Sequence, residues 1–338
     1  MINAGVIGLG VGEQHLITLL NHDYIDKVFI FDHDNCKLRD VHARFPNAIM
    51  VRNELEIIGH PNCHLVCIAS YDSDHCGQIL GCIKGEQNIF VEKPVCLNID
   101  EAKSIIQELK KNPDIRFSSN LILRRSARFM DVKERVDSGA FGELYSIDAD
   151  YLYGRVNKIT EGWRGKIDHY SVFLGGGIHM VDLVRWLSGK EAVSVFAHSN
   201  KIVTQGSPFR YDDFVSATIM FDGGMHARIT ANFGCVHPHY HALKIFGTKA
   251  TFINEVGPAK LYNTSSPDDN CQFINTAYPG CEKGDLLVSY IDEVKEKSLP
   301  AYTIEDIFES MAVCFAVERS IKMQKSVHVN EIRQELSL

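Results

Sequence analysis

The sequence predicts an α/β protein: a doubly wound parallel sheet in the first third, then an α/β domain with a large, open, mostly antiparallel sheet. Strand and helix patterns alternate strictly up to about residue 120, which is typical of parallel strands joined by right-handed crossovers. Later segments alternate apolar and polar residues with a period of two, as antiparallel strands with one buried face do. A length of 338 residues fits two domains of roughly 150 residues each.

The individual elements follow from these two patterns. In the first domain we expect buried strands at residues 4–9, 27–31, 64–69, 88–91 and 115–119, and helices at 13–20, 36–45, 75–84 and 99–111. In the second we expect helices at 127–137, 177–187, 286–297 and 303–322, strands at 214–221 and 225–233, and a polar loop at 263–270. The boundary falls near residue 120, giving domains 1–120 and 121–338.

Composition and charge limit the class of partner. Apolar residues make up 45% of the chain and charged residues 23%, as in an ordinary globular protein. The formal net charge is −8, so we expect neither nucleic acid nor an acidic membrane surface as a partner, because both need a basic face. No apolar run approaches the roughly 18 residues of a membrane span. Ten cysteines without a CxxC pair indicate reduced thiols and a cytoplasmic protein.

A glycine-rich turn follows the first expected strand. Gly8, Gly10 and Gly12, with Val11 between the last two, would let the backbone turn tightly and approach a pyrophosphate at a helix N-terminus, as in a Rossmann fold. The next position carries Glu where the usual motif has Gly or Ala, so we expect Gly12 to serve the close packing. Asp32, at the end of the second strand, would accept hydrogen bonds from the ribose of NAD and repel the 2′-phosphate of NADP. A glycine turn without a ligand is the alternative.

Two further segments carry groups suited to chemistry. Glu92, Lys93 and Pro94 follow the strand at 88–91, and open α/β sheets bind ligands outside the carboxyl ends of their strands. We expect Lys93 to point into that crevice and Glu92 to position it. A triple glycine at 175–177 precedes His179 and Asp182, which share a helix face at a spacing of three. From these residues alone, a surface lysine and a structural histidine at a helix start stay open as alternatives.

Together the three segments resemble the glucose–fructose oxidoreductase, inositol dehydrogenase and MocA family (Gfo/Idh/MocA). Glu92-Lys93-Pro94 is similar to the E-K-P signature of that family, and the stretch from Gly177 to Asp182 is similar to its G-x-H-x-x-D segment. Similar residues occur in order along the whole chain: Gly8, Gly10, His15, Asn120, Gly139, Gly142, Trp163 and Arg164.

The resemblance implies a Rossmann domain that binds NAD, with NADP less favoured, and a second domain that binds substrate. In that family the open sheet commonly mediates oligomerisation, which implies a homodimer or homotetramer. The implied reaction is hydride transfer between nicotinamide and a secondary alcohol of a sugar, cyclitol or nucleotide-linked sugar. Lys93 would contact the reacting hydroxyl, His179 would be the acid/base, and the bond between Lys93 and Pro94 would often be cis.

One departure from the family concerns the partner of His179. Inositol dehydrogenase-like members carry an Asp four residues before the histidine, and this chain has Gly175. Because Asp182 shares the helix face with His179, we expect it to orient the histidine, as the third catalytic residue. Asp168 is a second candidate.

The remaining candidates surround these groups. Near the cofactor we expect Ser70, Tyr71, His75 and Asn120, and near the substrate Arg125, Trp163 and Arg164. Arg124 and Arg125 could equally begin a solvated helix. His237, His239 and His241 alternate on an expected strand, where imidazoles could hold zinc or nickel. Hydride transfer to nicotinamide needs no metal, so we favour a role on the sheet face or in a subunit contact, and expect no metal.

Two rival functions also stay open. A ligand-binding regulator could keep the dinucleotide site without turnover. An enzyme could also use bound NAD transiently for elimination or isomerisation, with no net redox change. Net formation of NADH from NAD and a sugar distinguishes a dehydrogenase from both rivals.

Overall fold

The computed structural model describes residues 1–165, 167–266, 271–298 and 302–338, which form two compact units. Unit 1 comprises Met1–Ile122, Glu282–Phe308 and Leu336–Leu338, and unit 2 comprises Leu123–Cys281 and Glu309–Glu335. The chain therefore changes units close to the expected residue 120 and returns to unit 1 after Cys281. Of the loop expected at 263–270, residues 267–270 lie outside the described part of the chain.

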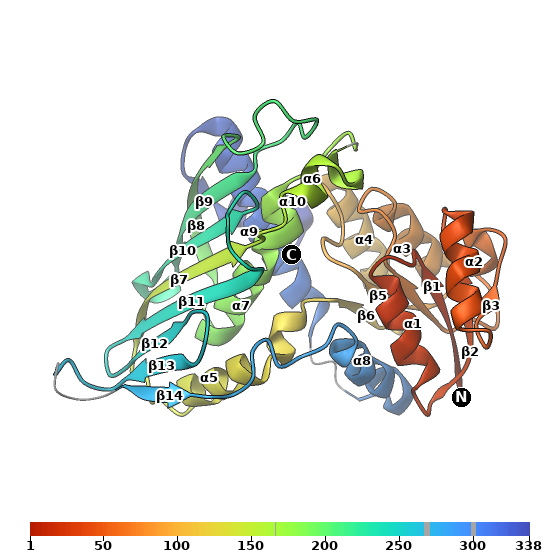
Figure 1. Cartoon of the computed structure of the whole chain (residues 1–338), viewed down its shortest axis with the longest axis horizontal. Coiled ribbons are helices and arrows are strands. Elements are labelled where there is room, and N and C mark those ends of the chain that lie inside the picture. Colours follow the sequence, from red (N-terminus) through yellow and green to blue (C-terminus); the bar gives the residue numbers. More distant parts are fainter. Residues whose placement is uncertain (166, 267–270, 299–301) are drawn as a thin grey trace. The chain divides into compact units, whose positions relative to one another are not determined.

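Unit 1 contains a six-stranded parallel sheet with strand order β3-β2-β1-β4-β5-β6, flanked by helices (Figure 1). The order reverses between β1 and β4, which is the position where doubly wound sheets bind ligands. The strands are β1 (Ile2–Ile7), β2 (Ile25–Phe31), β3 (Ile49–Met50), β4 (Leu65–Ile68), β5 (Asn88–Val91) and β6 (Phe117–Ser119). The helices are α1 (Gly12–Leu20), α2 (Asn35–Arg44), α3 (His75–Lys84), α4 (Ile99–Lys111) and α8 (Asp285–Glu296). The predicted doubly wound sheet is confirmed. The short strand β3 was not expected, and α8, which we expected in the second domain, belongs to unit 1 because residues 282–308 return to it.

Helix α4 illustrates why these residues form their elements. The side chain of Asn98 caps the helix by accepting a hydrogen bond from the Glu101 amide at 2.9 Å. Glu101 reaches back to accept from the Leu97 amide at 2.8 Å. Lys110 and Lys111 lie in the last turn, where cations complement the helix dipole. Because caps, charge and apolar period agree, the helix has the bounds that the sequence predicts.

Unit 2 contains a nine-stranded sheet with order β14-β13-β12-β11-β7-β10-β9-β8-β15 (Figure 1). Among the strand pairs of this sheet that the structure describes, only β7 and β10 are parallel, so the predicted mostly antiparallel sheet is confirmed. The strands are β7 (Leu144–Leu152), β8 (Ala192–Asn200), β9 (Phe214–Phe221), β10 (His226–Asn232), β11 (Tyr240–Gly247), β12 (Thr251–Asn254), β13 (Ala259–Tyr262), β14 (Gln272–Ile274) and β15 (Val327–His328). The helices are α5 (Ala127–Asp137), α6 (Asn157–Thr160), α7 (Ile178–Ser188) and α10 (Val329–Leu336), while α9 (Ile304–Met323) crosses from unit 1 into unit 2.

One prediction about the second sheet is wrong. Strand β11 begins only at Tyr240, so His237, His239 and His241 do not share one strand face. The ring of His237 instead contacts the backbone carbonyl of Pro238, at 2.7 Å from Nδ1. His241 is the histidine that enters the strand, and it pairs in register with Tyr151 of β7.

A π-helical turn, Phe173–Gly177, leads directly into α7 and contains the triple glycine. A Cβ on Gly176 would lie 2.5 Å from Cε1 of Tyr151 and 2.7 Å from Cε2 of Phe233, both of which are buried ring atoms. A Cβ on Gly177 would lie 2.8 Å from the ring of Phe173. The glycines therefore allow the start of α7 to approach the aromatic side of the sheet more closely than any larger residue could.

The ten cysteines are all free thiols, as the sequence predicts. Burial raises the pKa of the Cys63 thiol to about 12, although a hydrogen bond to the Leu65 carbonyl opposes the increase. Such a thiol packs as a small apolar side chain. In the part of the chain that the structure describes, no helix is both long and apolar enough to cross a bilayer.

Replacing Gly176 by Ala should lower the free energy of unfolding by about 1–3 kcal/mol, because the new methyl group must displace two buried rings. Denaturant unfolding of the full chain measures this change. Gly77→Ala is the matched control, because Gly77 is exposed on α3 and a Cβ there meets nothing within 4 Å. The control should leave stability unchanged or raise it by up to about 1 kcal/mol. Equal stability of the Gly176 variant and the wild type would contradict the packing argument.

Candidate active site

The glycine turn after β1 has the geometry of a phosphate cradle. Gly8 has a φ of +85°, and a Cβ there would lie 2.4 Å from the Ala69 carbonyl oxygen, so the tight turn requires glycine. Gly10 is exposed, and Lys37 Nζ, at 3.6 Å, is the one heavy atom of the described chain that its Cβ would meet. Gly12 opens α1, and its Cβ would lie only 3.0 Å from Val6. The three glycines thus supply the turn, the open approach and the helix–strand packing that a dinucleotide needs.

The start of α1 leaves its backbone amides available to a ligand. Val11 occupies the N-cap position and makes no side-chain cap. The first N–H groups of a helix have no partner inside the helix, and together with the helix dipole they attract an anion. The residues present therefore fit the pyrophosphate of a dinucleotide.

Asp32, directly after β2, binds the glycine turn. Its Oδ2 accepts a hydrogen bond from the Leu9 amide at 2.7 Å, and its Oδ1 accepts from the Asp34 amide at 2.8 Å. Lys37 Nζ lies 3.6 Å from Oδ2. Lys37 was not identified from the sequence, although its position one helical turn after Asp34, the N-cap of α2, could have indicated a contact with Asp32. The side chain of Asp32 is 13% exposed at the strand end, where a ribose would be recognised.

Two aromatic rings flank this end of the sheet. His33 and Tyr71 stack with their centroids 6.4 Å apart and an interplanar angle of 16°. Tyr71 is 44% exposed, so the stack presents a ring surface to solvent. The neighbouring Ser70 donates a hydrogen bond to Gln78 Oε1 at 2.6 Å. Ser70 and Tyr71 thus follow β4 at the carboxyl edge, where the sequence predicts cofactor contacts.

Glu92 forms the centre of a buried network beside Lys93. Its Oε1 accepts a hydrogen bond from Asn120 Nδ2 at 2.7 Å and lies 3.0 Å from Nε2 of His15. Burial raises the pKa of Glu92, but the hydrogen bond and charge of His15, the charge of Lys93 and the Asn120 amide outweigh it and lower the pKa to about 2. Glu92 is therefore an anion, directly before the half-buried Lys93 at the end of β5. The bond between Lys93 and Pro94 is cis, as the resemblance implies.

His75 supports the same segment from α3. Its Nδ1 lies 2.8 Å from the Pro94 carbonyl oxygen, and because a carbonyl only accepts, Nδ1 carries the proton. Within the described residues, the fully buried Nε2 of His75 has no hydrogen-bond partner, and neither has Oδ1 of Asn120. Buried acceptors of this kind are normally paired. A bound group that offers amide N–H donors, as the nicotinamide carboxamide does, would fit them.

His179 lies in the first turn of α7, inside unit 2. The side chain is 7% exposed. Tyr151 of β7 stacks against its ring at 5.9 Å with an interplanar angle of 20°. His241 of β11 meets the same ring nearly at right angles, also at 5.9 Å between centroids. The predicted acid/base residue is thus set in an aromatic environment that the sequence patterns did not indicate.

The structure gives Asp182 a different partner from the one expected. Arg124 binds both of its carboxylate oxygens, with Nε donating to Oδ2 at 3.0 Å and Nη2 to Oδ1 at 2.6 Å. Ser310 Oγ also lies 3.4 Å from Oδ1. The side chain is fully buried, and a two-point pair with arginine fixes its direction. Asp182 therefore stabilises a buried ion pair, and Arg124 is neither a substrate group nor a solvated helix start.

The expected substrate residues belong to unit 2. Trp163 and Arg164 form a 3-10 turn in which the guanidinium carbon of Arg164 lies 4.5 Å over the indole. Arg164 Nε also donates to the hydroxyl of Tyr170 at 3.1 Å. Arg125 is half-buried at the end of the 3-10 turn Ile122–Arg125. Asp168 is fully exposed and lies 3.4 Å from Arg210, which leaves it a surface residue.

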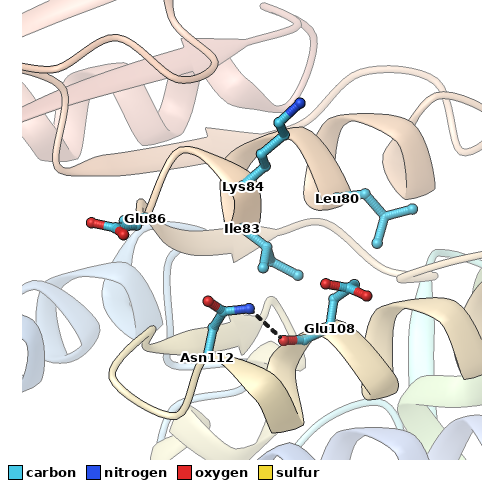
Figure 2. A pocket seen from close by; sticks show the side chains of 6 residues that line it. All are labelled: Leu80, Ile83, Lys84, Glu86, Glu108 and Asn112. Atoms are coloured by element: carbon cyan, nitrogen blue, oxygen red, sulfur yellow. Dashed lines mark hydrogen bonds between the residues drawn. The ribbon is translucent and has the colours of Figure 1, made fainter.

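The concave surfaces of unit 1 lie away from these groups. A groove of about 570 Å³ runs between α3 and α4 and is lined by Leu80, Ile83, Lys84, Glu86, Glu108 and Asn112 (Figure 2). Its lining residues end the two helices and precede β5 and β6, so the groove is at the amino edge of the sheet. A ligand of the doubly wound sheet binds at the opposite, carboxyl edge. We therefore assign the groove no part in the site.

The described residues contain no group of three or more His, Cys, Asp or Glu side chains arranged to hold a metal ion. The rings of His239 and His241 lie 5.0 Å apart at 76°, which is a ring contact. Both rings also contact Tyr151, and His241 contacts His179.

The fold and the glycine turn define a dinucleotide-binding α/β protein, and comparison with known proteins specifies the class. Residues 2–120 match the oxidoreductase family with an NAD-binding Rossmann fold, and residues 129–253 match the GFO/IDH/MocA C-terminal domain. The chain therefore belongs to the GFO/IDH/MocA family of NAD-binding oxidoreductases, which confirms the resemblance.

Individual relatives agree over nearly the full length. The chain is 24% identical to myo-inositol 2-dehydrogenase from Thermotoga maritima over 345 residues, covering 97% of this chain and 98% of the relative. Levoglucosan dehydrogenase, solved in complex with NADH, has a TM-score of 0.86 at 19% identity, covering 97% of this chain and 99% of its own. Scyllo-inositol dehydrogenase from Lactobacillus casei, solved with NAD(H) and scyllo-inositol, has a TM-score of 0.81 at 18% identity, covering 98% of this chain and 99% of its own.

The pKa of Glu92 predicts how stability depends on pH. Because folding lowers that pKa from 4.5 to about 2, the ionised group stabilises the fold above pH 4.5, and this contribution is lost as the pH falls towards 2. Glu92→Gln should therefore cost about 3 kcal/mol at pH 7 and progressively less below pH 4.5. Unfolding of the cofactor-free chain across this range measures the difference.

Glu296→Gln is the matched control, because Glu296 is exposed on α8. This variant should follow the wild type at every pH. A destabilisation by Glu92→Gln that stayed constant between pH 7 and pH 2 would contradict the assigned charge state.

Proposed function

We propose that this protein is an NAD-dependent dehydrogenase that interconverts a secondary alcohol of a sugar or cyclitol and the corresponding ketone. The observation that carries the proposal is the buried Glu92 network, which holds Lys93 at the carboxyl edge of β5, on the same sheet as the glycine turn. A cation held in this way by an ionised neighbour suits a group that must stabilise a developing negative charge.

In this mechanism the two units contribute different groups. NAD, when bound, supplies the hydride acceptor, and the chain supplies orientation and charge. His179 takes the proton of the reacting hydroxyl, and Lys93 stabilises the alkoxide that develops as the C–H bond breaks. In the reverse direction His179 returns the proton to the ketone oxygen. The joint action of Lys93 and His179 across the two units is itself part of the proposal.

The substrate class follows from the relatives and from unit 2. The relatives are named for myo-inositol, scyllo-inositol and levoglucosan, which are rings rich in hydroxyl groups. Trp163 offers an aromatic face, and Arg164 and Arg125 offer hydrogen-bond donors. We assign these three residues to the substrate side, and Asn120, His75, Ser70 and Tyr71 to the cofactor side.

The proposal extends to assembly and location. The outer face of the nine-stranded sheet carries the exposed side chains of Phe196 and Thr218 and an ion pair between Arg228 and Asp150 at 2.7 Å. We propose that this face joins copies of the chain into a homodimer or homotetramer. We place the protein in the cytoplasm, where its ten thiols would stay reduced.

The test is NADH absorbance after mixing the protein with NAD and a panel of myo-inositol, scyllo-inositol, levoglucosan and common hexoses. Net NADH formation with one of them supports the dehydrogenase. A product without net NADH indicates transient use of the cofactor, and binding of NAD without any product indicates a regulator. Either of the last two results would overturn the proposal.

Lys93→Met should lower kcat to less than a tenth of the wild-type value, a loss of more than about 1.4 kcal/mol of transition-state stabilisation. Affinity for NAD should change little, because the glycine turn and Asp32 make most contacts to the dinucleotide. Stopped-flow turnover and calorimetry measure the two quantities. Lys84→Met, in the groove at the amino edge of the sheet, is the control and should retain full activity. Retention of more than a tenth of kcat by the Lys93 variant would remove that residue from the mechanism.

Asp32 should make the protein prefer NAD over NADP by at least tenfold in Kd, about 1.4 kcal/mol, because its carboxylate would repel a 2′-phosphate. Titration calorimetry with the two cofactors measures this ratio. Asp32→Ser should narrow the preference, since Lys37 would then offer its charge to the phosphate. Equal affinities in the wild type would show that Lys37 or His33 already accommodates the phosphate.

A further inference from the structure

Position 175 lies four residues before the histidine proposed as the acid/base, and the space beside it is filled. A Cβ on Gly175 would lie 2.5 Å from the hydroxyl oxygen of Tyr170 and 3.0 Å from its Cζ. Tyr170 is 4% exposed, and Arg164 donates to the same hydroxyl. A side chain at position 175 would therefore require the ring of Tyr170 to move. Arg124 binds both carboxylate oxygens of Asp182, and aromatic rings contact His179 from two sides.

The rings around His179 orient its imidazole. Tyr151 and His241 are register partners on β7 and β11, and both point to the buried face of the sheet against which α7 packs. Tyr151 stacks on the His179 ring, and His241 meets it nearly at right angles. Two ring contacts from different directions restrict how the imidazole of His179 can rotate, whereas a single contact would restrict it less.

The hydroxyl of Tyr278 in turn fixes the ring of His241. The oxygen accepts a hydrogen bond from the His241 backbone amide at 3.0 Å and lies 2.6 Å from His241 Nδ1. A phenol has one proton, and within the described residues Nδ1 is the acceptor that the structure offers it. The hydroxyl therefore donates to Nδ1, and the proton of neutral His241 is on Nε2. Burial raises the pKa of Tyr278, which keeps this donor protonated, although the backbone hydrogen bond opposes the increase.

This hydrogen bond also keeps His241 neutral. Protonation of His241 would place a proton on Nδ1, facing the phenol hydrogen, and the hydrogen bond to the neutral form would be lost. Because His179 and His241 are 7% and 9% exposed and in ring contact, charge on one also disfavours charge on the other. A substrate proton therefore goes to His179, and His241 does not compete for it.

We infer that His241 and Tyr278 form a positioning pair for His179. The inference rests on the proposed role of His179 as the acid/base. His241 is not assigned contact with the substrate, and its part is to set the orientation of the His179 ring and to remain uncharged beside it.

Other titratable groups face the pair from each neighbouring element. On the strand side, Tyr151 of β7 faces the pair, and the cations Arg155 and Arg164 act on it. His239 lies on the same side, with its ring 5.0 Å from that of His241. The guanidinium of Arg128 lies 5.3 Å over the Tyr278 ring. On α7 itself, Arg124 neutralises Asp182. Tyr240, whose ring lies 4.5 Å from that of Tyr278, and Cys281 also act on the phenol. The Tyr278 hydroxyl bonds His241 directly, so its removal should act through His241.

Tyr278→Phe is the variant that tests the pair, and the pH profile of kcat/KM is the measurement. Without the hydroxyl, Nδ1 of His241 no longer faces a phenol hydrogen and can take up a proton, and the charge on His241 then disables the neighbouring base. The acid limb of the kcat/KM profile should move to higher pH by about one unit. On the plateau, kcat should fall roughly tenfold, because the His179 ring is held less firmly. NAD affinity should not change.

The double variant Tyr278→Phe, His241→Asn distinguishes the effect of charge on His241 from the structural effect of losing the Tyr278 hydroxyl. Asparagine does not titrate, so the acid limb should return to the wild-type pH although kcat stays low. Tyr240→Phe is the matched control, because that hydroxyl bonds Asn254 and Glu255 instead of a histidine ring. It should keep both the wild-type profile and the wild-type kcat. An acid limb that Tyr278→Phe leaves in place, or that His241→Asn fails to restore, would overturn the inference.

A second readout needs no turnover. In the full chain with ¹⁵N-labelled histidine, the ring nitrogens of His241, identified by their loss in His241→Asn, should report the Nε2–H tautomer at neutral pH. An Nδ1–H tautomer or a charged ring would overturn the inference. Retained activity of His179→Gln would instead overturn the proposed role of His179, while the tautomer result would still stand, so the two failures are distinguishable.

Discussion

The carboxylate of Glu92 is the interaction on which the cofactor-binding unit depends. It joins the buried side of α1, through His15, to the end of β6, through Asn120, and both hydrogen bonds meet at the residue before Lys93. An uncompensated buried carboxylate would be costly, so the three elements must assemble together for the ion to be tolerated. His75 adds a fourth tie, from α3 to Pro94. The lysine segment is thereby fixed by the packing of the whole doubly wound core.

In unit 2, aromatic packing instead of a charged network holds the proposed catalytic residue, His179. The histidine of α7 is held between the rings of Tyr151 and His241, and glycine at 176 is what lets the helix come close enough for these contacts. Ring contacts restrict an imidazole without supplying charge, whereas a carboxylate both restricts it and raises its proton affinity. The two units therefore set up their proposed catalytic groups by different physical means, one ionic and one largely neutral.

Sequence patterns predicted the fold where local signals agreed. Helices α3, α4 and α5 have the predicted bounds because each has a clear apolar period, to which α4 adds a side-chain cap and acids in its first turn. The two exposed residues of β3 carry no such pattern. Strand β7 did carry one, since Ile147, Ala149 and Tyr151 alternate with outward-facing acids, and that signal was overlooked.

The candidate site could be predicted only where its residues lie in short motifs. The glycine turn, the Glu92-Lys93-Pro94 segment and the stretch around His179 are contiguous, and each has a recognisable spacing. The contacts of Asp182 with Arg124 and of His241 with Tyr278 join residues 58 and 37 positions apart. No local periodicity encodes contacts of that range, so the sequence suggested the nearest acid on the helix and missed the phenol.

The contact between Gly175 and Tyr170 has a consequence for how such a site changes in evolution. An aspartate introduced at 175 would collide with the tyrosine hydroxyl, and loss of the tyrosine alone would leave a void beside a glycine helix turn. Each of these substitutions alone is unfavourable, whereas both together replace the Gly175–Tyr170 contact by an acid beside a smaller residue. The two positions are therefore coupled: an acid at 175 requires a smaller residue at 170, and tyrosine at 170 requires glycine at 175.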